Sequence, residues 1–244
     1  MLEITFARPD KKNALTNAMY DAARLTLEEA QSNRAIQVVL FSGEGDVFTA
    51  GNDMVEFVNV ANGQAGTLQA LPFIQALAQA AKPIVAAVPG LAVGVGTTML
   101  LHCDLVYVAE TAKLSAPFVN LGLAPEAASS LLLPACIGHV RAFAMFALGE
   151  SLSGPEAVAL GLANKALPQD EVLPAARAAA KALARKPAGS LVSTKKLMRD
   201  AAALMARIDQ ENIIFGKQLK GDEAREALHA FIERRPPDFS KCQS

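Results

Sequence analysis

The chain has 244 residues, of which 52% are hydrophobic and 19% are charged, and its formal net charge is −1. This length and apolar fraction suit one large domain, or a domain with a small appendage, and the balanced charge indicates neither a nucleic-acid partner nor an acidic membrane surface. Tryptophan is absent and aromatic residues make up 5% of the chain, so a stacking platform for nucleic-acid bases is not expected.

The three cysteines, Cys103, Cys136 and Cys242, are widely spaced, odd in number and form no CxxC motif. This pattern argues against a disulfide framework and predicts a reducing, cytoplasmic location. The most apolar segment, residues 84–101, contains Pro and Gly turn signals, so we interpret it as a buried strand, a loop and a helix rather than a membrane span. The histidines show no metal-ligand spacing, and no metal site is predicted.

The first half of the chain alternates between strand and helix patterns. Strand patterns cover residues 2–7, 38–41, 83–88, 104–109 and 113–115. Helical patterns cover residues 16–33, 68–81 and 97–103. Residues 47–54 indicate a strand end that enters a loop or short helix, and the Gly-, Asn- and Ala-rich residues 59–67 are expected to be mobile. This alternation predicts an α/β fold with a mostly parallel sheet and right-handed crossovers.

The second half is mainly helical. Pro125 predicts a helix that opens at Glu126 and runs towards Leu133, because proline is favoured in the first turn. Beyond Arg141, helical patterns cover residues 155–160, 172–185, 190–208, 212–219 and 223–234. The whole pattern therefore predicts an α/β core that is followed by a C-terminal helical region.

Several motifs stand in an order that is typical of one family. They are residues 8–15 (RPDKKNAL), 48–54 (FTAGNDM), 82–96 (KPIVAAVPGLAVGVG), 103–107 (CDLVY) and 225–235 (REALHAFIERR). Over nearly its whole length the chain resembles the crotonase (enoyl-CoA hydratase/isomerase) superfamily. The resemblance implies a spiral core of ββα units over residues 1–190 and a C-terminal helical trimerisation region over residues 191–244. It also implies an acyl-CoA thioester substrate, no separate cofactor, and a homotrimer or hexamer.

In that family two backbone N–H groups hold the thioester oxygen, and by resemblance these belong to Asn52 and Val95. An enolate oxygen needs fixed donors in a dry site, and amides at glycine-flanked turns supply them. Gly94-Val95-Gly96 alone is equally an ordinary strand-to-helix turn, and residues 50–53 an Asx turn. The order of the two turns favours the oxyanion interpretation. The residues that we expect to contact the substrate are Ala50, Gly51, Asp53, Met54, Gly94, Phe118 and Leu121.

The candidate base is Glu126. Hydratases of the family use two glutamates, whose positions fall on Thr98 and Phe118 here, so both carboxylates are missing. Residues 121–130 (LGLAPEAASS) instead resemble Δ3,Δ2-enoyl-CoA isomerases of the peroxisomal type, in which Glu126 matches the catalytic base. The alternative role for Glu126 is a first-turn carboxylate that complements the helix dipole.

The resemblance therefore implies an isomerase that converts 3-enoyl-CoA to 2-enoyl-CoA through a dienolate. No water is needed, so an apolar pocket is an advantage, and its burial would raise the pKa of Glu126. Phe118, Leu121, Leu123 and Leu131 could line this pocket. Enoyl-CoA hydration, other enolate chemistry on an acyl-CoA, and a non-catalytic CoA-binding interaction module remain as alternatives.

Two further expectations concern the ends of the chain. Lys217, Arg234 and Arg235 are candidates for contacts with the coenzyme A phosphates, with no ground for choosing among them. The family normally has about one more strand before residues 2–7. Either the first hairpin is lost or the start codon was chosen downstream, and the sheet edge would then be less protected.

Overall fold

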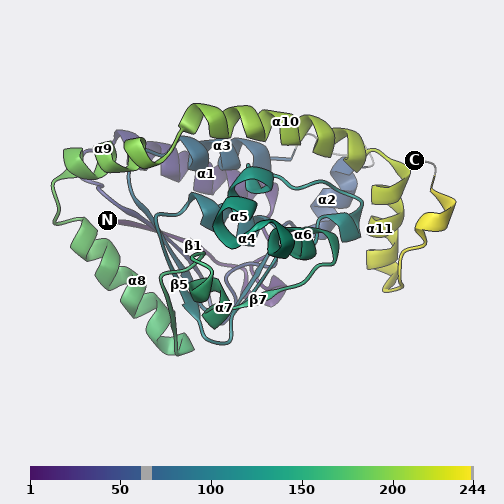
Figure 1. Ribbon diagram of the computed structural model, residues 1–244, viewed down its shortest axis with the longest axis horizontal. Coiled ribbons are helices and arrows are strands. Elements are labelled where there is room, and N and C mark those ends of the chain that lie inside the picture. Colours follow the sequence, from purple (N-terminus) through teal and green to yellow (C-terminus); the bar gives the residue numbers. More distant parts are fainter. Residues whose placement is uncertain (62–67, 243–244) are drawn as a thin grey trace.

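Two sheets form the centre of the protein in the computed structural model, which describes residues 1–61 and 68–242 (Figure 1). The larger sheet has the order β1-β2-β3-β5-β8, with every neighbouring pair parallel. Its strands are β1 (Leu2–Phe6), β2 (Val39–Gly43), β3 (Ile84–Val88), β5 (Leu105–Ala109) and β8 (Lys165–Leu167). In the smaller sheet, β4 (Leu91–Val93) pairs in parallel with β6 (Lys113–Ser115), which pairs antiparallel with β7 (Leu152–Ser153). The predicted α/β class and parallel pairing are confirmed.

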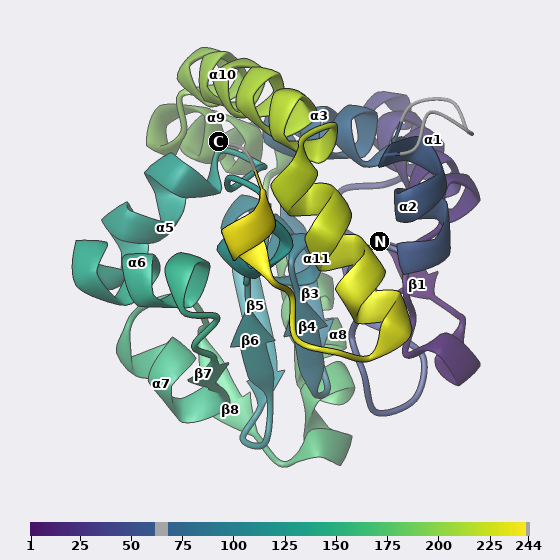
Figure 2. The same cartoon turned by 90° about the vertical axis from the view of Figure 1, so that its right-hand side faces the viewer.

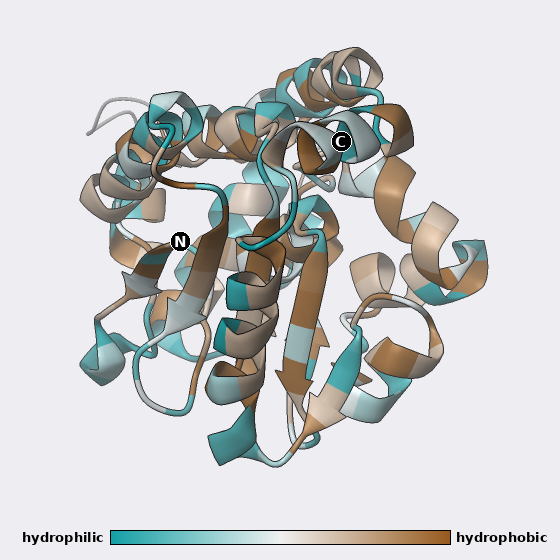
Figure 3. Ribbon diagram, turned by 90° about the vertical axis from the view of Figure 1, so that its left-hand side faces the viewer, coloured by the Kyte–Doolittle hydropathy of each residue, from teal (hydrophilic) through white to brown (hydrophobic). Residues whose placement is uncertain are grey.

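Helices bury the sheets. All five residues of β3 and the first four of β2 are buried, which explains why these strands are continuous apolar runs without alternation. Figure 3 shows the central strands in the brown of hydrophobic residues. Helix α8 (Gln169–Leu183) packs on β2, β3 and β5, while α1 (Asn17–Ser32) packs on α3 (Ala70–Gln79), which in turn contacts α10 (Ala201–Leu219).

The C-terminal region consists of α9 (Ala188–Met198), α10 and α11 (Asp222–Glu233), and Figure 2 shows α11 descending from the end of α10. The prediction of a single helix over residues 190–208 is wrong, because α9 ends at Met198 and a second helix follows. Arg199 is extended and donates to the carbonyls of Leu101 and His102, and Asp200 begins a new helix by accepting from the N–H of Ala203 at 3.0 Å. The division of the chain between residues 190 and 191 stays a prediction.

Two boundaries near the candidate site differ from expectation. The helix predicted to open at Glu126 begins three residues later, as α5 (Ser129–Ile137), because Ala127 and Ala128 both have positive φ angles, 62° and 54°. The helix predicted over residues 97–103 is α4 (Val95–Thr98) followed by a 3-10 turn, η2 (Met99–His102). Residues 59–61 of the stretch expected to be mobile form the end of α2 (Met54–Ala61), and residues 62–67 lie outside the described residues.

Short elements were the hardest to predict. β4, β7 and β8 have two or three residues each, too few to display a period in the sequence. The remaining elements are the helices α6 (His139–Ala147) and α7 (Gly154–Ala159) and the 3-10 turns η1 (Pro9–Lys11), η3 (Val119–Leu121) and η4 (Phe239–Lys241). Within residues 1–61 and 68–242, no helix combines the length and the apolar character that crossing a membrane requires.

Candidate active site

The two glycine-flanked turns lie side by side. Thr49 forms a parallel bridge with Ala92, and its carbonyl accepts from the N–H of Val93 at 3.1 Å, so residues 48–52 run along β4. Gly51 has φ +88°, and a Cβ there would lie 2.9 Å from the carbonyl oxygen of Val93. Only glycine permits this backbone angle together with this close approach. The turn that contains Asn52 is therefore held against the strand that leads to Val95.

Within residues 1–61 and 68–242, no group accepts a hydrogen bond from the N–H of Asn52 or of Val95. Around Asn52, the N–H of Leu15 donates to the carbonyl of Gly51 at 2.8 Å and the N–H of Asp53 to the carbonyl of Leu15 at 2.9 Å, which leaves the N–H of Asn52 outside the pairing. Val95 is the first residue of α4, and an N–H in the first turn of a helix has no intrahelical acceptor. Two such amides on adjacent turns can stabilise an anionic oxygen.

The Glu126 carboxyl is held beside the second of these turns. Thr98, one helical turn after Val95 on α4, donates its hydroxyl to Oε1 of Glu126 at 2.7 Å. Among the described residues, Oε2 accepts no hydrogen bond. The Glu126 side chain is partly buried. Because Glu126 lies in the loop before α5, the alternative role of a carboxylate in the first turn of that helix is wrong.

The environment of Glu126 changes its acidity. Burial raises the pKa of Glu126, the hydrogen bond from Thr98 lowers it, and the negative charge of Glu211 raises it again, with a result of about 7. A carboxyl group with a pKa near neutral pH can both accept and return a proton under physiological conditions. This acidity, in a site with two free amides, is what proton transfer next to a thioester carbonyl requires.

Asp53 supports the first turn. Its carboxylate pairs with Arg8 at 2.5 Å and accepts from the N–H groups of Val55 and Glu56 at 3.0 and 3.2 Å, which caps α2. Burial would raise the pKa of Asp53, but the hydrogen bond from Arg8 and those from the α2 amides bring it below the ordinary value. The Asp53 carboxylate is therefore committed to holding the turn, and its contact with a substrate stays a prediction.

Sequence reasoning missed Tyr20. This buried residue of α1 donates its hydroxyl to Oδ1 of Asn52 at 2.6 Å. Burial and the charge of Glu126 both raise the pKa of Tyr20, so its hydroxyl stays protonated and remains a donor. A single Tyr in a helical pattern does not indicate a contact with a turn 32 residues later in the chain.

The other predicted contact residues lie on the two turns, at the start of α2 and next to η3. Ala50 donates to the carbonyl of Lys12 at 2.9 Å, Met54 begins α2, and Gly94 precedes Val95 with φ 57°. Phe118 is buried, with its ring centroid 5.9 Å from that of Phe146. Their contacts with a substrate stay predictions.

The leucines expected to form the apolar wall differ in exposure. Leu121, at the end of η3, is partly buried and packs on the core, and Leu123 is buried. Leu131 is 40% exposed, and its place in the pocket wall stays a prediction.

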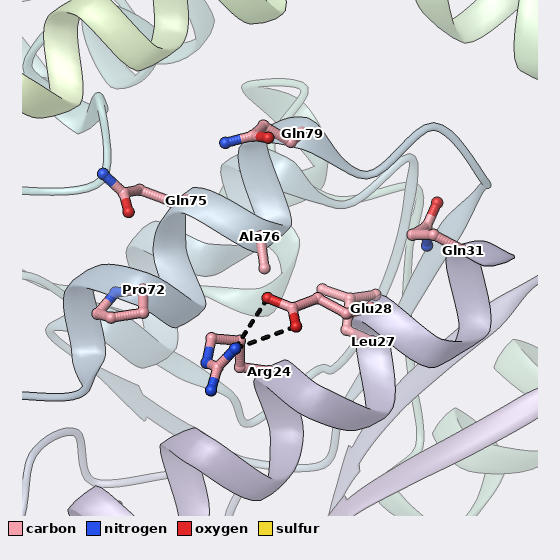
Figure 4. A pocket seen from close by; sticks show the side chains of 8 residues that line it. All are labelled: Arg24, Leu27, Glu28, Gln31, Pro72, Gln75, Ala76 and Gln79. Atoms are coloured by element: carbon pink, nitrogen blue, oxygen red, sulfur yellow. Dashed lines mark hydrogen bonds and ion pairs between the residues drawn. The ribbon is translucent and has the colours of Figure 1, made fainter.

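A separate hollow lies between α1 and α3 (Figure 4). Arg24, Glu28, Gln31 and Gln79 are among the residues that line it, and Arg24 pairs with Glu28 at 3.0 Å. None of Asn52, Val95 and Glu126 belongs to this hollow. The part of the chain that the structure describes contains no cluster of three or more His, Cys, Asp or Glu side chains placed to hold a metal ion.

Comparison with known proteins identifies the family to which the chain is similar. The sequence model of a family described as "Enoyl-CoA hydratase/isomerase" matches residues 1–242. The chain is 32% identical over 241 residues to "Enoyl-CoA delta isomerase 2" of Rattus norvegicus, with 96% of the chain matching 61% of that relative's length. It is 33% identical to "2,3-dehydroadipyl-CoA hydratase" of Escherichia coli, with 98% and 94% of the two chains covered.

A solved structure has the same fold. An enoyl-CoA hydratase/isomerase from Pseudoalteromonas atlantica superposes with a TM-score of 0.91 at 38% identity, covering 98% of this chain and 96% of the other. The expected crotonase architecture is thereby confirmed. The relatives carry both isomerase and hydratase names at similar identity, so their names do not choose between the two reactions.

Proposed function

The chain belongs to the enoyl-CoA hydratase/isomerase family, and we propose that within it this protein converts 3-enoyl-CoA thioesters to 2-enoyl-CoA thioesters. The observation that carries the proposal is the Glu126 carboxyl, which is hydrogen-bonded by Thr98 and has a pKa of about 7. One carboxyl group of this acidity is sufficient to move a proton between two carbons of the same substrate.

In the proposed reaction, the N–H groups of Asn52 and Val95 bind the thioester oxygen, and the free Oε2 of Glu126 removes a proton from C2. The electron pair of the broken C2–H bond enters a conjugated system with the C3–C4 double bond, and the negative charge gathers on the thioester oxygen. The two amides stabilise this dienolate because they are already oriented. Glu126 then donates the same proton to C4, and the double bond is left between C2 and C3.

Hydration fits this site less well. By resemblance, the two glutamates of a hydratase correspond to Thr98 and Phe118, and neither side chain can activate a water molecule or protonate carbon near neutral pH. In addition, the Thr98 hydroxyl is already engaged with Glu126. A non-catalytic CoA-binding module would have no use for a carboxyl group of raised pKa beside two free amides.

The proposal is tested by mixing the protein with a 3-enoyl-CoA and following the absorbance of the conjugated 2-enoyl thioester. Glu126→Gln should reduce turnover by about a hundredfold or more while binding of the thioester persists. Glu150→Gln, a change at an exposed glutamate, is the matched control and should leave turnover intact. Retained turnover in Glu126→Gln would remove Glu126 from the role of base, and loss of absorbance from a 2-enoyl-CoA would indicate hydration instead.

A further inference from the structure

Helix α10 holds the backbone of the segment that contains Glu126. Oε2 of Glu211 accepts from the N–H of Ala128 at 2.6 Å, and its Oε1 accepts from the N–H of Ser130 at 3.0 Å. Two helical turns further along α10, Oε1 of Gln218 accepts from the N–H of Ala124 at 2.7 Å. Figure 1 shows α10 running along the top of the molecule, above α3 and α5 in that view. Three backbone amides on both sides of Glu126 are therefore fixed by one face of α10.

The peptide group between Ala127 and Ala128 is held at both ends. Its N–H donates to Glu211, and its carbonyl oxygen lies 2.8 Å from Nε2 of His102. Nδ1 of His102 lies 3.0 Å from the Arg199 guanidinium, which can only donate, so Nδ1 accepts and Nε2 carries the proton. Burial and the charge of Arg199 lower the pKa of His102 to about 3, which keeps the ring neutral.

This peptide needs external support. Ala127 and Ala128 are consecutive non-glycine residues in the left-handed region, where the Cβ of an L residue crowds the backbone. Such a conformation persists only when the surrounding structure over-determines it. This conformation ends the loop abruptly and keeps Glu126 out of α5. In that loop, the Glu126 side chain accepts the hydrogen bond from Thr98.

We propose that Glu211 is a positioning residue of the active site, which together with His102 locks the Ala127–Ala128 peptide and thereby holds the Glu126 carboxyl in place. The proposal rests on the proposed function in one respect, that Glu126 is the base. Nothing in the motifs of the sequence pointed to Glu211, which lies 83 residues from Ala128 along the chain.

The buried side chain of Glu211 also acts through its charge. Burial raises the pKa of Glu211 above its ordinary value, while the N–H donors that face both of its oxygens favour the ionised carboxylate. In that ionised form, the negative charge of Glu211 raises the pKa of Glu126. Other titratable groups also face Glu126 and Glu211. The charge of Arg207 on α10 lowers the pKa of Glu211. Tyr20 on α1 stays protonated, and His102 stays neutral. Removal of the Glu211 charge should therefore lower the pKa of Glu126.

The test is the pH profile of kcat/KM for a 3-enoyl-CoA. Free Glu126 must be ionised to act as a base, so kcat/KM should rise with pH through about 7. Glu211→Gln keeps the side-chain shape but loses the charge and one of the two acceptor oxygens. We expect this acid limb to move to lower pH by about one unit, with a lower plateau because the loop is less firmly held.

Gln218→Ala is the matched control, since it removes an anchor of the same loop by the same helix without a change of charge. Its acid limb should stay at the wild-type pH whatever happens to kcat. An unmoved limb in Glu211→Gln would overturn the proposal, as would an equal shift in Gln218→Ala. If Glu211→Gln does not fold, Glu211→Asp retains the charge but cannot span both amides. Its limb should then stay in place while kcat falls, and an unchanged kcat would overturn the proposal.

A readout that is independent of turnover separates this inference from the proposed function. The protonated-carboxyl infrared band of Glu126 can be assigned by its loss in Glu126→Gln and titrated without a substrate. A shift of this titration to lower pH in Glu211→Gln supports the inference even in a protein that isomerises no 3-enoyl-CoA. An identical titration in the wild type and Glu211→Gln overturns it, even in an active isomerase.

Discussion

The hydroxyl of Thr98 is the smallest feature on which the proposed chemistry depends. It occupies a position where the resemblance places a glutamate in hydratases, and it donates a hydrogen bond to Glu126. Its hydrogen bond stabilises the ionised carboxylate and lowers the pKa of Glu126, against the burial that raises it. In the proposed reaction, Thr98 moderates the acidity of Glu126 and binds its Oε1, while Oε2 acts on the substrate.

Thr98→Val removes the hydroxyl but keeps the side-chain shape. The pKa of Glu126 should rise further above 7, so the acid limb of kcat/KM should move to higher pH by about one unit. At pH values below this limb, the variant should be slower than the wild type because less Glu126 is ionised. Thr98→Ser retains the donor and should keep the limb in place. A coincident profile for Thr98→Val and the wild type would show that the hydroxyl does not control the base.

At this scale the sequence predicts some residues and not others, for a physical reason. Asn52, Val95 and Glu126 belong to short motifs whose order along the chain could be compared with a family. The side chains that hold the site in place come from remote positions along the chain. Arg199 lies 97 residues from His102, which it contacts, and Glu211 lies 83 residues from Ala128. Contacts over such separations depend on the fold as a whole and leave no local pattern.

Among the elements, strands were predicted where burial alone determines composition. β2 and β3 lie in the interior, and their apolar runs have few alternative interpretations. The start of α5 was mispredicted because Pro125 is a local helix signal, whereas the Ala127–Ala128 conformation depends on tertiary hydrogen bonds. The break between α9 and α10 was missed for the same reason, since Arg199 turns towards the carbonyls of η2.

The turn that carries Asn52 offers a test of how closely two elements are packed. Gly51→Ala would place a Cβ 2.9 Å from the carbonyl oxygen of Val93, at a φ of +88°. We expect a loss of about 2–3 kcal/mol in the free energy of unfolding, which combines left-handed strain with displacement of the backbone. The N–H of Asn52 should move with the turn, so kcat should also fall, by about tenfold or more.

Gly45→Ala is the matched control for this turn. Gly45 also has a positive φ, +77°, but no atom lies within 4 Å of the added Cβ. The loss there should be about 1 kcal/mol, from left-handed strain alone, with kcat unchanged. Urea unfolding and kcat of both variants give the comparison. Equal losses of stability in the two variants would show that the approach of Gly51 to β4 is less tight than the structure indicates.

On the scale of the whole molecule, the C-terminal helices complete the site rather than merely follow the core. α10 contacts α3 and, through Glu211 and Gln218, also holds the Glu126 loop. The sequence predicted helices in this region because their apolar periodicity is strong. It did not predict their part in the site, because a single buried carboxylate in a long helix looks like any solvated charge.

The outer helices also leave large apolar side chains exposed, which bears on assembly. Val140 and Phe143 of α6 are 80% and 63% exposed, and Leu197 and Met198 of α9 are exposed as well. Exposed apolar side chains in such numbers are typical of protein interfaces. We therefore expect the trimer or hexamer that the family resemblance implies, with α6 and α9 as candidate contacts.

Light scattering after size-exclusion chromatography should give three or six times the chain mass of 25.6 kDa. Phe143→Asp should shift the mass towards that of one chain, because a charge buried at an interface is costly to desolvate. Leu25→Asp, at a position of α1 that is also exposed, should leave the assembly intact. A single-chain mass for the wild type at micromolar concentration would contradict the assembly. A Phe143→Asp variant with the full mass would instead place the interface away from α6.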